Sequence, residues 1–444
     1  MSRSLVRPLV DGYRLLSAIP GARAIFFRPE LDKFGSRLRA LGGIYRRAIL
    51  RRTRIVAVIG SLGKTTTARA VTAALDCPDR RFSFSNYGAS LALNLMRIRR
   101  EDPYAVLEAG VAGPGFMAAY GRMIRPDVVV VTAIASEHNR SFPTLLDTRA
   151  EKVRVVQSLS KNGVAVLNGD DPHVRWMASQ TDARVITFGF GADNDIRALG
   201  VDRCDGSAAI DVLVDGTAHR IASRLHGDHM VYPMLAALAV AHAEKRDLRS
   251  AIARLQQLPP TPGRMELIVL PDGTRILDDS YKAALESVHA ALETAAGIDA
   301  ARKIVVLGNV EEPPGKQGEI YRDLGRRLAG FAQFVVCIGG EHMTAVRAGA
   351  RAAGMDRAAV RLAGSRIGPA LELLKETVRP GSLVLIKGAS TQRLRRITLA
   401  LLGRTCSCRV KYCAAKAASC DVCPLLQAEP KWFENHFVKR CTWL

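Results

Sequence analysis

A glycine-rich loop between a strand and a helix constrains this chain more than any other feature. The apolar, β-branched run Arg54–Ile59 predicts a buried parallel strand, and residues 64–75 have a helical composition. Between them stands Gly60-Ser-Leu-Gly-Lys-Thr-Thr-Thr67. The glycines let backbone amides turn towards phosphate oxygens at the positive end of the helix. The pattern therefore predicts a nucleotide-binding α/β domain.

The polar residues of this loop indicate a triphosphate and a metal ion. Lys64 is placed to reach the β- and γ-phosphates, and the Thr65 hydroxyl is placed to bind Mg²⁺. The usual loop has its first Gly five positions before its second, and Val58 stands there in this chain. The shorter form is typical of a narrower group of ATP-binding proteins. The loop residues expected to contact ATP are Gly60, Ser61, Leu62, Gly63, Lys64, Thr65 and Thr66.

Strand–helix alternation continues from this loop to a proline-rich linker. Residues 193–225 differ, because alternating polarity with Asp and Gly turns predicts a small antiparallel insertion. A helix is expected over residues 229–244. The linker Leu258–Gly263 holds three prolines and a glycine, which end both helices and strands. Further parallel strands are expected before it at 104–108, 127–134, 163–167 and 184–188.

A second α/β unit follows the linker. Its expected strands lie at 275–277, 303–307, 334–338 and 383–386, and a helix is expected over 392–402. Such alternation predicts parallel sheets with helices on both faces. The expected parts of the chain are a basic N-terminal arm (1–53), a central P-loop ATPase domain (54–258), a C-terminal domain (259–403) and a Cys-rich basic tail (404–444).

Positive charge gathers at the two ends of the chain. Residues 1–54 carry 13 Lys and Arg against 3 Asp and Glu, and residues 393–444 carry 10 against 3. The ends thus hold +17 of the net charge of +22. Arg interleaved with apolar residues in the first arm is compatible with an interfacial helix on an anionic membrane. An acidic partner protein, or an Arg-rich solvated surface packed on the first domain, remains an alternative.

Composition excludes several classes of protein. Apolar residues make up 48% of the 444 residues, so the chain can fill cores and is not disordered along its length. Its longest apolar runs are much shorter than the roughly 18 to 20 residues of a membrane span. No continuous apolar segment follows the N-terminal basic residues, which argues against a signal peptide. A cytoplasmic protein, with peripheral membrane contact as an option, is the expectation.

Several motifs, in order over residues 54–402, resemble the Mur ligase family, nearest to its D-alanyl-D-alanine-adding members. The phosphate loop comes first, and Asn86 resembles the Asn-rich segment that follows the first helix. The other matching motifs are Leu107-Glu-Ala-Gly110, Arg125-Pro126, Glu137-His138, Ala150-Glu-Lys152, Asn168-Gly-Asp-Asp171, Gly227-Asp-His229, Pro262-Gly-Arg264, Asp278-Asp-Ser-Tyr281 and Lys387-Gly388.

The resemblance implies a Rossmann-like C-terminal domain and an ATP-dependent ligase that forms amide or peptide bonds through an acyl phosphate. Thr65 and Glu108 would hold one Mg²⁺, and His138 a second. Lys152 matches a lysine that the family carbamylates, which would turn this cation into an anionic metal ligand. On the residues alone, His138 can also be an ordinary loop histidine and Lys152 a surface lysine. The implied catalytic residues are Lys64, Glu108, His138 and Lys152, and the implied nucleotide contacts from the C-terminal domain are Arg264, Asp279 and Lys282.

The sequence departs from the family pattern in four places. Met230 and Pro233 replace two Asn residues, which changes the donors and acceptors offered to the base. Lys282-Ala-Ala284 stands for Asn-Ala-Asn, and Ala389-Ser390 for Ser-Arg. Finally, only 53 residues precede the ATPase strand in this sequence, and we expect them to be too few for a full UDP-binding domain. We therefore expect an acyl substrate such as an amino acid or peptide, or one presented by a membrane or partner protein. The UDP-muramoyl tripeptide reaction of the family remains an alternative.

Six of nine cysteines follow residue 405. The two-residue spacing of Cys420 and Cys423 is typical of a zinc knuckle, but the gap to the other cysteines is short for a zinc ribbon. A Zn²⁺ site, reduced thiols and disulfides all remain open. The candidate zinc ligands are Cys406, Cys408, Cys413, Cys420 and Cys423.

The loop alone also allows a second class of function, a regulatory or nucleic-acid-binding P-loop ATPase that uses its basic ends. The ordered series Glu108, His138 and Lys152 favours the ligase. We therefore expect small carboxylate and amine substrates as partners, and no nucleic acid.

Overall fold

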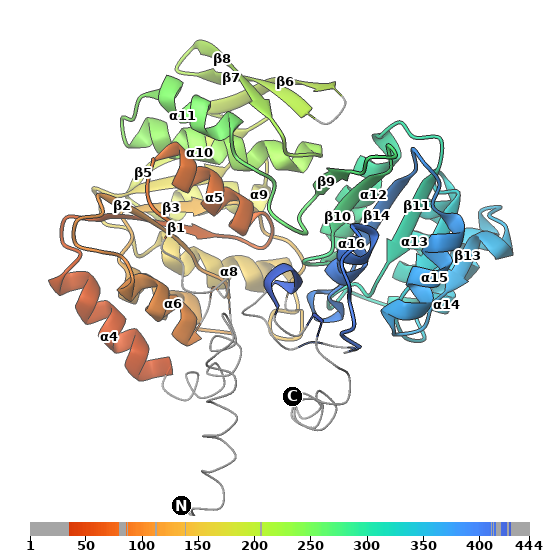
Figure 1. Cartoon of the computed structure of the whole chain (residues 1–444). Helices are drawn as coiled ribbons and strands as arrows, with labels where there is room; N and C mark the ends of the chain where they lie inside the picture. The colour runs from red at the N-terminus through yellow and green to blue at the C-terminus, as the bar shows by residue number, and fades with distance from the viewer. Residues whose placement is uncertain are drawn as a thin grey trace, which may run out of the picture.

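Two twisted sheets, each with helices on both faces, make up the computed structural model (Figure 1). No helix among its described residues is long and apolar enough to cross a membrane. The described residues are 35–79, 86, 88–111, 113–137, 139–204, 207–409, 411, 413, 419–423 and 426–427.

The first sheet has eight strands in the order β2-β1-β3-β4-β5-β6-β7-β8. Strands β1 to β6 pair in parallel, whereas β6, β7 and β8 form antiparallel hairpins. The strands are β1 (Arg54–Ile59), β2 (Tyr104–Glu108), β3 (Val128–Val131), β4 (Val164–Asn168), β5 (Arg184–Gly189), β6 (Ile196–Cys204), β7 (Ser207–Val214) and β8 (Thr217–Ser223).

Ten helical segments accompany this sheet in the described part of the chain. They are α4 (Gly35–Ala48), α5 (Lys64–Ala74), α6 (Gly88–Met96), α7 (Phe116–Ile124), α8 (Leu145–Val156), α9 (Pro172–Arg175), η1 (Trp176–Gln180), η2 (Asp228–Met230), α10 (Val231–Ala243) and α11 (Leu248–Gln256). Helix α10 is buried almost all round because it packs against α5 and β5 (Figure 1).

Strand β1 is buried on both faces, as its apolar run predicts. Val56 and Val58 belong to one apolar core, and Ile55 and Ile59 belong to the core on the opposite face. This alternation follows from the two-residue period of a strand. A sheet covered on both faces leaves the carboxyl ends of its strands as the open edge for a ligand.

The second sheet has the order β13-β12-β11-β14-β10-β9, with only β9 antiparallel. Its strands are β9 (Glu266–Val269), β10 (Arg275–Asp279), β11 (Lys303–Leu307), β12 (Phe334–Cys337), β13 (Val360–Leu362) and β14 (Leu383–Lys387). Its helical segments, with one from the tail, are α12 (Leu285–Gly297), α13 (Gln317–Ala329), α14 (Met343–Ala352), η3 (Arg357–Ala359), α15 (Ile367–Thr377), η4 (Ser390–Gln392), α16 (Arg395–Leu401) and η5 (Cys420–Val422).

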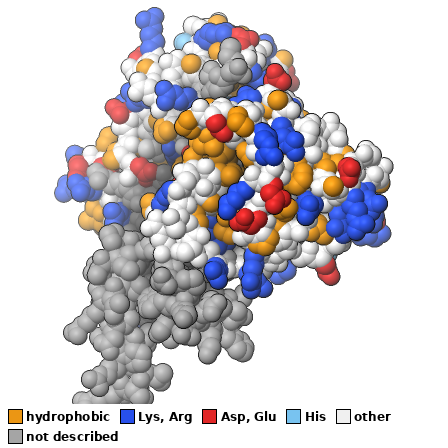
Figure 2. Space-filling view, turned by 45° about the vertical axis from the view of Figure 1, so that its right-hand side comes forward, with side chains coloured by type: hydrophobic (Ala, Val, Ile, Leu, Met, Phe, Trp, Pro, Cys, Tyr) orange, Lys and Arg blue, Asp and Glu red, His pale blue; other side chains and the backbone are white. Residues whose placement is uncertain are grey.

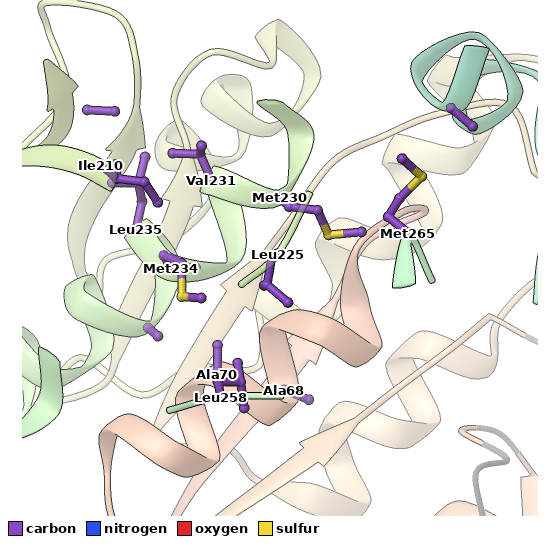
Figure 3. Close-up of a cluster of buried hydrophobic side chains, with 14 of the residues drawn as sticks. Ala68, Ala70, Ile210, Leu225, Met230, Val231, Met234, Leu235, Leu258 and Met265 are labelled. Carbon is purple, nitrogen blue, oxygen red and sulfur yellow. The ribbon is translucent and has the colours of Figure 1, made fainter. Parts of the chain in front are cut away.

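One apolar core extends from the first sheet to the second. Met230 of η2 and Met265, just after the linker, both belong to it, together with Leu225 and Leu258 (Figure 3). These side chains join the two α/β units beside the linker. The units therefore meet through packed apolar surface near the carboxyl ends of both sheets.

Most of the expected strands and helices begin and end within one or two residues of the observed limits, and the strand expected over 127–134 is the main exception. Strand β3 ends at Val131, so the expected strand over 127–134 was too long. The segment 193–225 does form antiparallel hairpins, but β6 also pairs in parallel with β5 through Phe188 and Ile196. The hairpins therefore extend the main sheet rather than stand apart from it.

Candidate active site

A cavity of about 1050 Å³ lies between the two units. That size is at the upper end for small-molecule sites, and it accommodates a nucleotide with a second substrate. The first sheet contributes the loops after β1, β2 and β3, and the second contributes the ends of β10 and β14. Because β1 lies between β2 and β3, its loop occupies the position where the strand order reverses.

The loop after β1 is held tightly by backbone contacts. Gly60 has a φ of 132°, and a Cβ there would lie 2.1 Å from Thr132 Oγ1. Only glycine fits such a position. Gly63, with a φ of 78°, precedes the first turn of α5. The amide of Ser61 donates to the carbonyl of Ala133 at 2.6 Å, which ties the loop to the segment after β3.

Lys64 folds back over its own loop. Its Nζ donates to the carbonyl oxygens of Gly60 and Ser61 at 2.7 and 2.8 Å. Within the described part of the chain, the buried Ser61 Oγ has no hydrogen-bond partner. An ammonium group that caps carbonyls and an unpaired buried hydroxyl both fit a site built to receive an anion.

Oxygen donors converge beside the first turn of α5. The Thr65 hydroxyl donates to Glu108 Oε2 at 2.9 Å, and Asn86 Nδ2 donates to Glu108 Oε1 at 2.6 Å. Mg²⁺ prefers oxygen ligands and is usually held by one or two protein groups together with phosphates and waters. The Thr65 and Glu108 pair fits that requirement.

Glu137, which follows β3, faces three lysines. Its carboxylate accepts from Lys152 Nζ at 2.7 Å and from Lys282 Nζ, and Lys64 Nζ lies 3.7 Å away. The side chain of Glu137 is 3% exposed and that of Lys152 is 1% exposed. Lys152 also donates to the carbonyl of Gly60 at 2.8 Å. One buried carboxylate thus links α8, the phosphate loop and the C-terminal unit.

Burial and charge shift the pKa values of this cluster. Burial alone would raise the pKa of Glu137, but Lys152, Lys64 and Lys282 hold it well below its usual range. Burial lowers the pKa of Lys64 to about 7, and Glu137 opposes the shift. Burial also lowers the pKa of Lys152, whereas Glu137 outweighs burial at Lys282 and raises its pKa. Without bound phosphate, Lys64 is therefore poised to lose its proton near neutral pH.

The C-terminal unit reaches the phosphate loop through Arg264. Its Nη2 donates to Thr65 Oγ1 at 3.0 Å, and its guanidinium lies 4.2 Å from the ring centre of Tyr281. The buried Nε of Arg264 has no hydrogen-bond partner among the described residues. Asp279 accepts from Lys387 Nζ and from the amide of Met265. Arg264 thus presents donors to the mouth of the loop, while Asp279 orders the strand ends beneath it.

Met230 and Pro233 line the part of the cavity that lies beside Phe188 and Tyr232. The carboxylate of Asp170 accepts from the Tyr232 hydroxyl at 3.0 Å and from the backbone amide of Phe190 at 2.6 Å. Met230 and Pro233 offer no side-chain hydrogen bond to a base. A base bound beside them would therefore rely on apolar contact and on neighbouring polar groups.

The cavity brings together most of the residues that the sequence singled out. Those that line it are Ser61, Leu62, Gly63, Lys64, Thr65, Thr66, Glu108, Arg264, Asp279 and Lys282. Gly60 and Lys152 lie directly behind them. His138 lies outside the described residues, so its position gives no information about a second metal.

Three residues of the site were not among the expected site residues. Glu137 and Asn86 appeared only as parts of motifs, and Lys387 only as the end of one. Lys387 is 1% exposed and donates to Asp279, to the carbonyl of Lys282 and to Ser287 Oγ. For Lys387, the available signal was a charged residue at the end of an apolar strand, since such a group is costly to bury without partners. Asn86 and Glu137 lie outside the strands and gave no such signal.

The zinc interpretation of the tail is not supported. None of the candidate thiols forms a disulfide, and the described residues hold no group of three or more His, Cys, Asp or Glu side chains suited to a metal. An ion pair docks the tail instead, because Asp421 Oδ1 lies 2.7 Å from Arg395 Nη2 on α16. The thiol of Cys406 donates to the carbonyl of Arg396 at 3.5 Å. The candidate thiols are Cys406, Cys408, Cys413, Cys420 and Cys423.

Fold and site define a two-unit α/β protein with a phosphate loop in the cavity between the units, and sequence comparison identifies its family. The Mur ligase middle domain matches residues 58–241, and the Mur ligase glutamate ligase domain matches residues 263–390. The chain therefore belongs to the Mur ligase family. It is an ATP-dependent enzyme that forms a carbon–nitrogen bond of the peptide type.

Individual relatives agree with this assignment. A UDP-N-acetylmuramoyl-tripeptide--D-alanyl-D-alanine ligase of Mycobacterium leprae is 29% identical over 385 residues, which cover 79% of this chain and 73% of the relative. The enzyme of the same description from Escherichia coli is 28% identical over 264 residues, covering 58% of each chain. The phosphate loop, Glu108 and Lys152 lie within the matched middle domain.

Solved structures agree in fold. A crystal structure of MurF from Acinetobacter baumannii has a TM-score of 0.73 at 24% identity, covering 83% of this chain and 80% of that one. A folylpolyglutamate synthase of Mycobacterium tuberculosis, solved with ADP and AMPPCP, has a TM-score of 0.62 at 19% identity and covers 90% of this chain and 99% of that one. In both cases the similarity is in fold, that is, in the arrangement of the two α/β units.

Proposed function

We propose that this cavity activates a carboxylic acid as an acyl phosphate and then lets an amine displace the phosphate. A carboxylate is unreactive towards amines at neutral pH because its leaving group would be oxide or hydroxide. Transfer of the γ-phosphoryl group makes phosphate the leaving group. The observation that carries the proposal is the convergence of Lys64, the Thr65–Glu108 pair and Arg264 on one cavity.

The chain's own cations bring two anions together. Lys64 and the amides of its loop hold the β- and γ-phosphates, and Arg264 holds the γ-phosphate from the opposite unit. Lys282 stands beside the incoming carboxylate, with Asp279 fixing the strand end behind it. Fixed positive groups of this kind stabilise charge that builds up as the phosphoryl group moves.

We propose Mg²⁺ as the metal, held by Thr65 and Glu108, since their oxygens suit it. When bound, it would neutralise phosphate charge. Lys152 is the proposed site of carbamylation, with His138 as a further ligand. Burial lowers the pKa of Lys152, which raises the share of neutral amine able to add to carbon dioxide with release of one proton; the carbamate would replace the ion pair that Lys152 makes with Glu137. The carbamate would carry negative charge to the floor of the cavity, next to Gly60.

We propose a small amino acid or peptide as the acyl substrate, in the cytoplasm where ATP is available. The relatives' names favour a second candidate, UDP-N-acetylmuramoyl-tripeptide with D-alanyl-D-alanine.

We also keep 54–258 and 259–403 as the proposed domain limits. The basic ends are proposed to provide peripheral contact with an anionic membrane or a partner protein, a role that does not depend on the ligase reaction.

The test is ADP release measured against a panel of amino acids and peptides, with UDP-muramoyl tripeptide and D-alanyl-D-alanine included. The proposal expects turnover only when a carboxylate and an amine are both present. Lys64→Ala should abolish it, whereas Lys375→Ala, on the exposed face of α15, should leave it unchanged. ADP release that needs DNA or RNA and no carboxylate would overturn the ligase proposal. Efficient use of the UDP-linked tripeptide would select the second candidate.

A further inference from the structure

Helix α4 turns two glycines, with the half-buried Leu38 and Tyr45, to the protein and presents other apolar side chains to solvent. Gly42 and Gly43 are buried, and a Cβ on Gly42 would lie 3.2 Å from Met123 Sδ. Leu41 and Ile44 lie on the outer face, each 54% exposed, and Ile49 just after the helix is 41% exposed. A surface helix normally buries its large aliphatic residues. Exposed aliphatic side chains gathered on one helix face mark it as a candidate contact surface.

Arginines surround these aliphatic side chains. Residues 35–54 contain seven arginines and no acidic residue. Helices α6 and α7 pack against α4 and bring further arginines beside it, at the end of α6 and along α7. In the same stretches, Glu101 is the only exposed acidic residue among those described. The exposed arginines of this surface are Arg37, Arg47, Arg51, Arg52, Arg97, Arg99, Arg100, Arg122 and Arg125.

This surface, hereafter the α4 surface, is fixed to the body of the protein. The Tyr45 hydroxyl donates to the carbonyl of Ile98 at 2.8 Å. The side chain of Arg46 points from α4 towards the body of the protein. Its Nη2 lies 2.9 Å from Asp127 Oδ2, and its Nε donates to the carbonyl of Ile124. Arg46 therefore serves to attach α4, and the exposed arginines named above lie around the outer face of the helix. The surface is rigid enough to bind without first being ordered.

We propose that the α4 surface docks on an anionic lipid bilayer. Arginines beside a membrane attract acidic headgroups, and exposed leucine and isoleucine side chains enter the boundary between headgroups and acyl chains. Nucleic acid would use the arginines but gives Leu41 and Ile44 no apolar partner. A second copy of this chain would place the same arginines opposite one another, which like-charge repulsion opposes. Figure 2, in which the C-terminal unit comes forward, shows more Lys and Arg than Asp and Glu on that face, so positive charge is not confined to the α4 surface.

Vesicle binding is tested with the full chain and without nucleotide. A failure of the docking proposal is then distinct from a failure of the ligase proposal. Co-sedimentation is measured with vesicles of equal parts phosphatidylcholine and phosphatidylglycerol, and with phosphatidylcholine alone. We expect binding to the anionic vesicles that weakens as salt rises. In Arg47→Ala/Arg51→Ala, binding should fall about fivefold for each arginine removed. In Leu41→Ser/Ile44→Ser, it should fall about tenfold at unchanged charge.

Matched controls lie on the C-terminal unit. Arg357→Ala/Arg361→Ala removes two exposed arginines, and Val269→Ser removes an apolar side chain that is 63% exposed. Both should bind vesicles like the unchanged protein. Unaltered circular dichroism would establish that the α4 variants are folded. Wild-type vesicle binding by either α4 variant would overturn the proposal, as would tighter binding to duplex DNA than to anionic vesicles.

Discussion

Replacement of Glu137 by Gln tests the buried charge cluster most sharply. The substitution keeps the shape of the side chain but removes the charge that faces Lys152, Lys282 and Lys64. At an effective dielectric constant of roughly 20, the pair at 2.7 Å is worth about 6 kcal/mol and the one at 3.7 Å about 4 kcal/mol before desolvation. Desolvation offsets most of this attraction in the intact cluster.

Without the Glu137 carboxylate, the cost of burying the three lysines is no longer offset by attraction. The loss of stability is therefore large, even though the intact cluster adds little net stability. Breaking one buried ion pair typically costs about 3 to 5 kcal/mol. We expect Glu137→Gln to lower the free energy of unfolding by that amount at pH 7, measured by guanidinium titration. In Glu137→Gln/Lys152→Met, the loss should be smaller than the sum of the two single losses.

The matched control is Glu372→Gln on α15, whose partner Lys375 lies 2.9 Å away with both side chains about 70% exposed. An exposed pair of this kind contributes less than about 1 kcal/mol, so this change should be nearly neutral. A loss below 1 kcal/mol for Glu137→Gln, equal to that of the control, would refute the description of Glu137 as the counter-charge of the site.

Three further predictions concern the phosphate site. Because the pKa of Lys64 is about 7 without bound phosphate, ATP binding at pH 8 should take up close to one proton as the phosphate restores the charge of Lys64. At pH 5.5, where Lys64 is already charged, ATP binding should take up almost none. Calorimetry in buffers of different ionisation enthalpy measures this proton uptake, and zero uptake at pH 8 would contradict the lowered pKa. Glu108→Gln should raise the Mg²⁺ concentration needed for half-maximal turnover about tenfold or more, and an unchanged requirement would exclude Glu108 from the metal site. Arg264→Lys should lower kcat by about 100-fold with a smaller change in the KM for ATP, because it removes the planar donor set at the γ-phosphate. A raised KM with unchanged kcat would instead assign Arg264 to binding that is equal in the ground state and the transition state.

The sequence predicted the strands that carry the site because they are long apolar runs. Arg54–Ile59, Tyr104–Glu108 and Lys303–Leu307 are strands over the expected residues. The edge strands β9 and β13 were missed, since β9 is only half-buried and β13 has three residues. Edge strands depend on a neighbour for their pairing, so their own residues carry a weak signal.

The site was predictable as a set of motifs and only partly as a geometry. The phosphate loop and Glu108 follow strands, so their meeting at one edge of the sheet was foreseeable. The position of Glu137 was not, because its partners Lys152 and Lys282 are 15 and 145 residues away in the chain. The zinc interpretation of the tail finds no support among the described residues, and cysteine spacing gave no sign of the Arg395–Asp421 pair that docks the tail.

Transfer of oxygen from substrate to phosphate tests the central claim most directly. The most active carboxylic acid from the panel is labelled with ¹⁸O in its carboxyl group and turned over with its amine. If the acid attacks the γ-phosphorus, the released phosphate acquires one labelled oxygen, which phosphorus NMR detects as a shifted signal. Phosphate without label would mean that water, not the carboxylate, takes the phosphoryl group, and it would contradict the acyl-phosphate reaction.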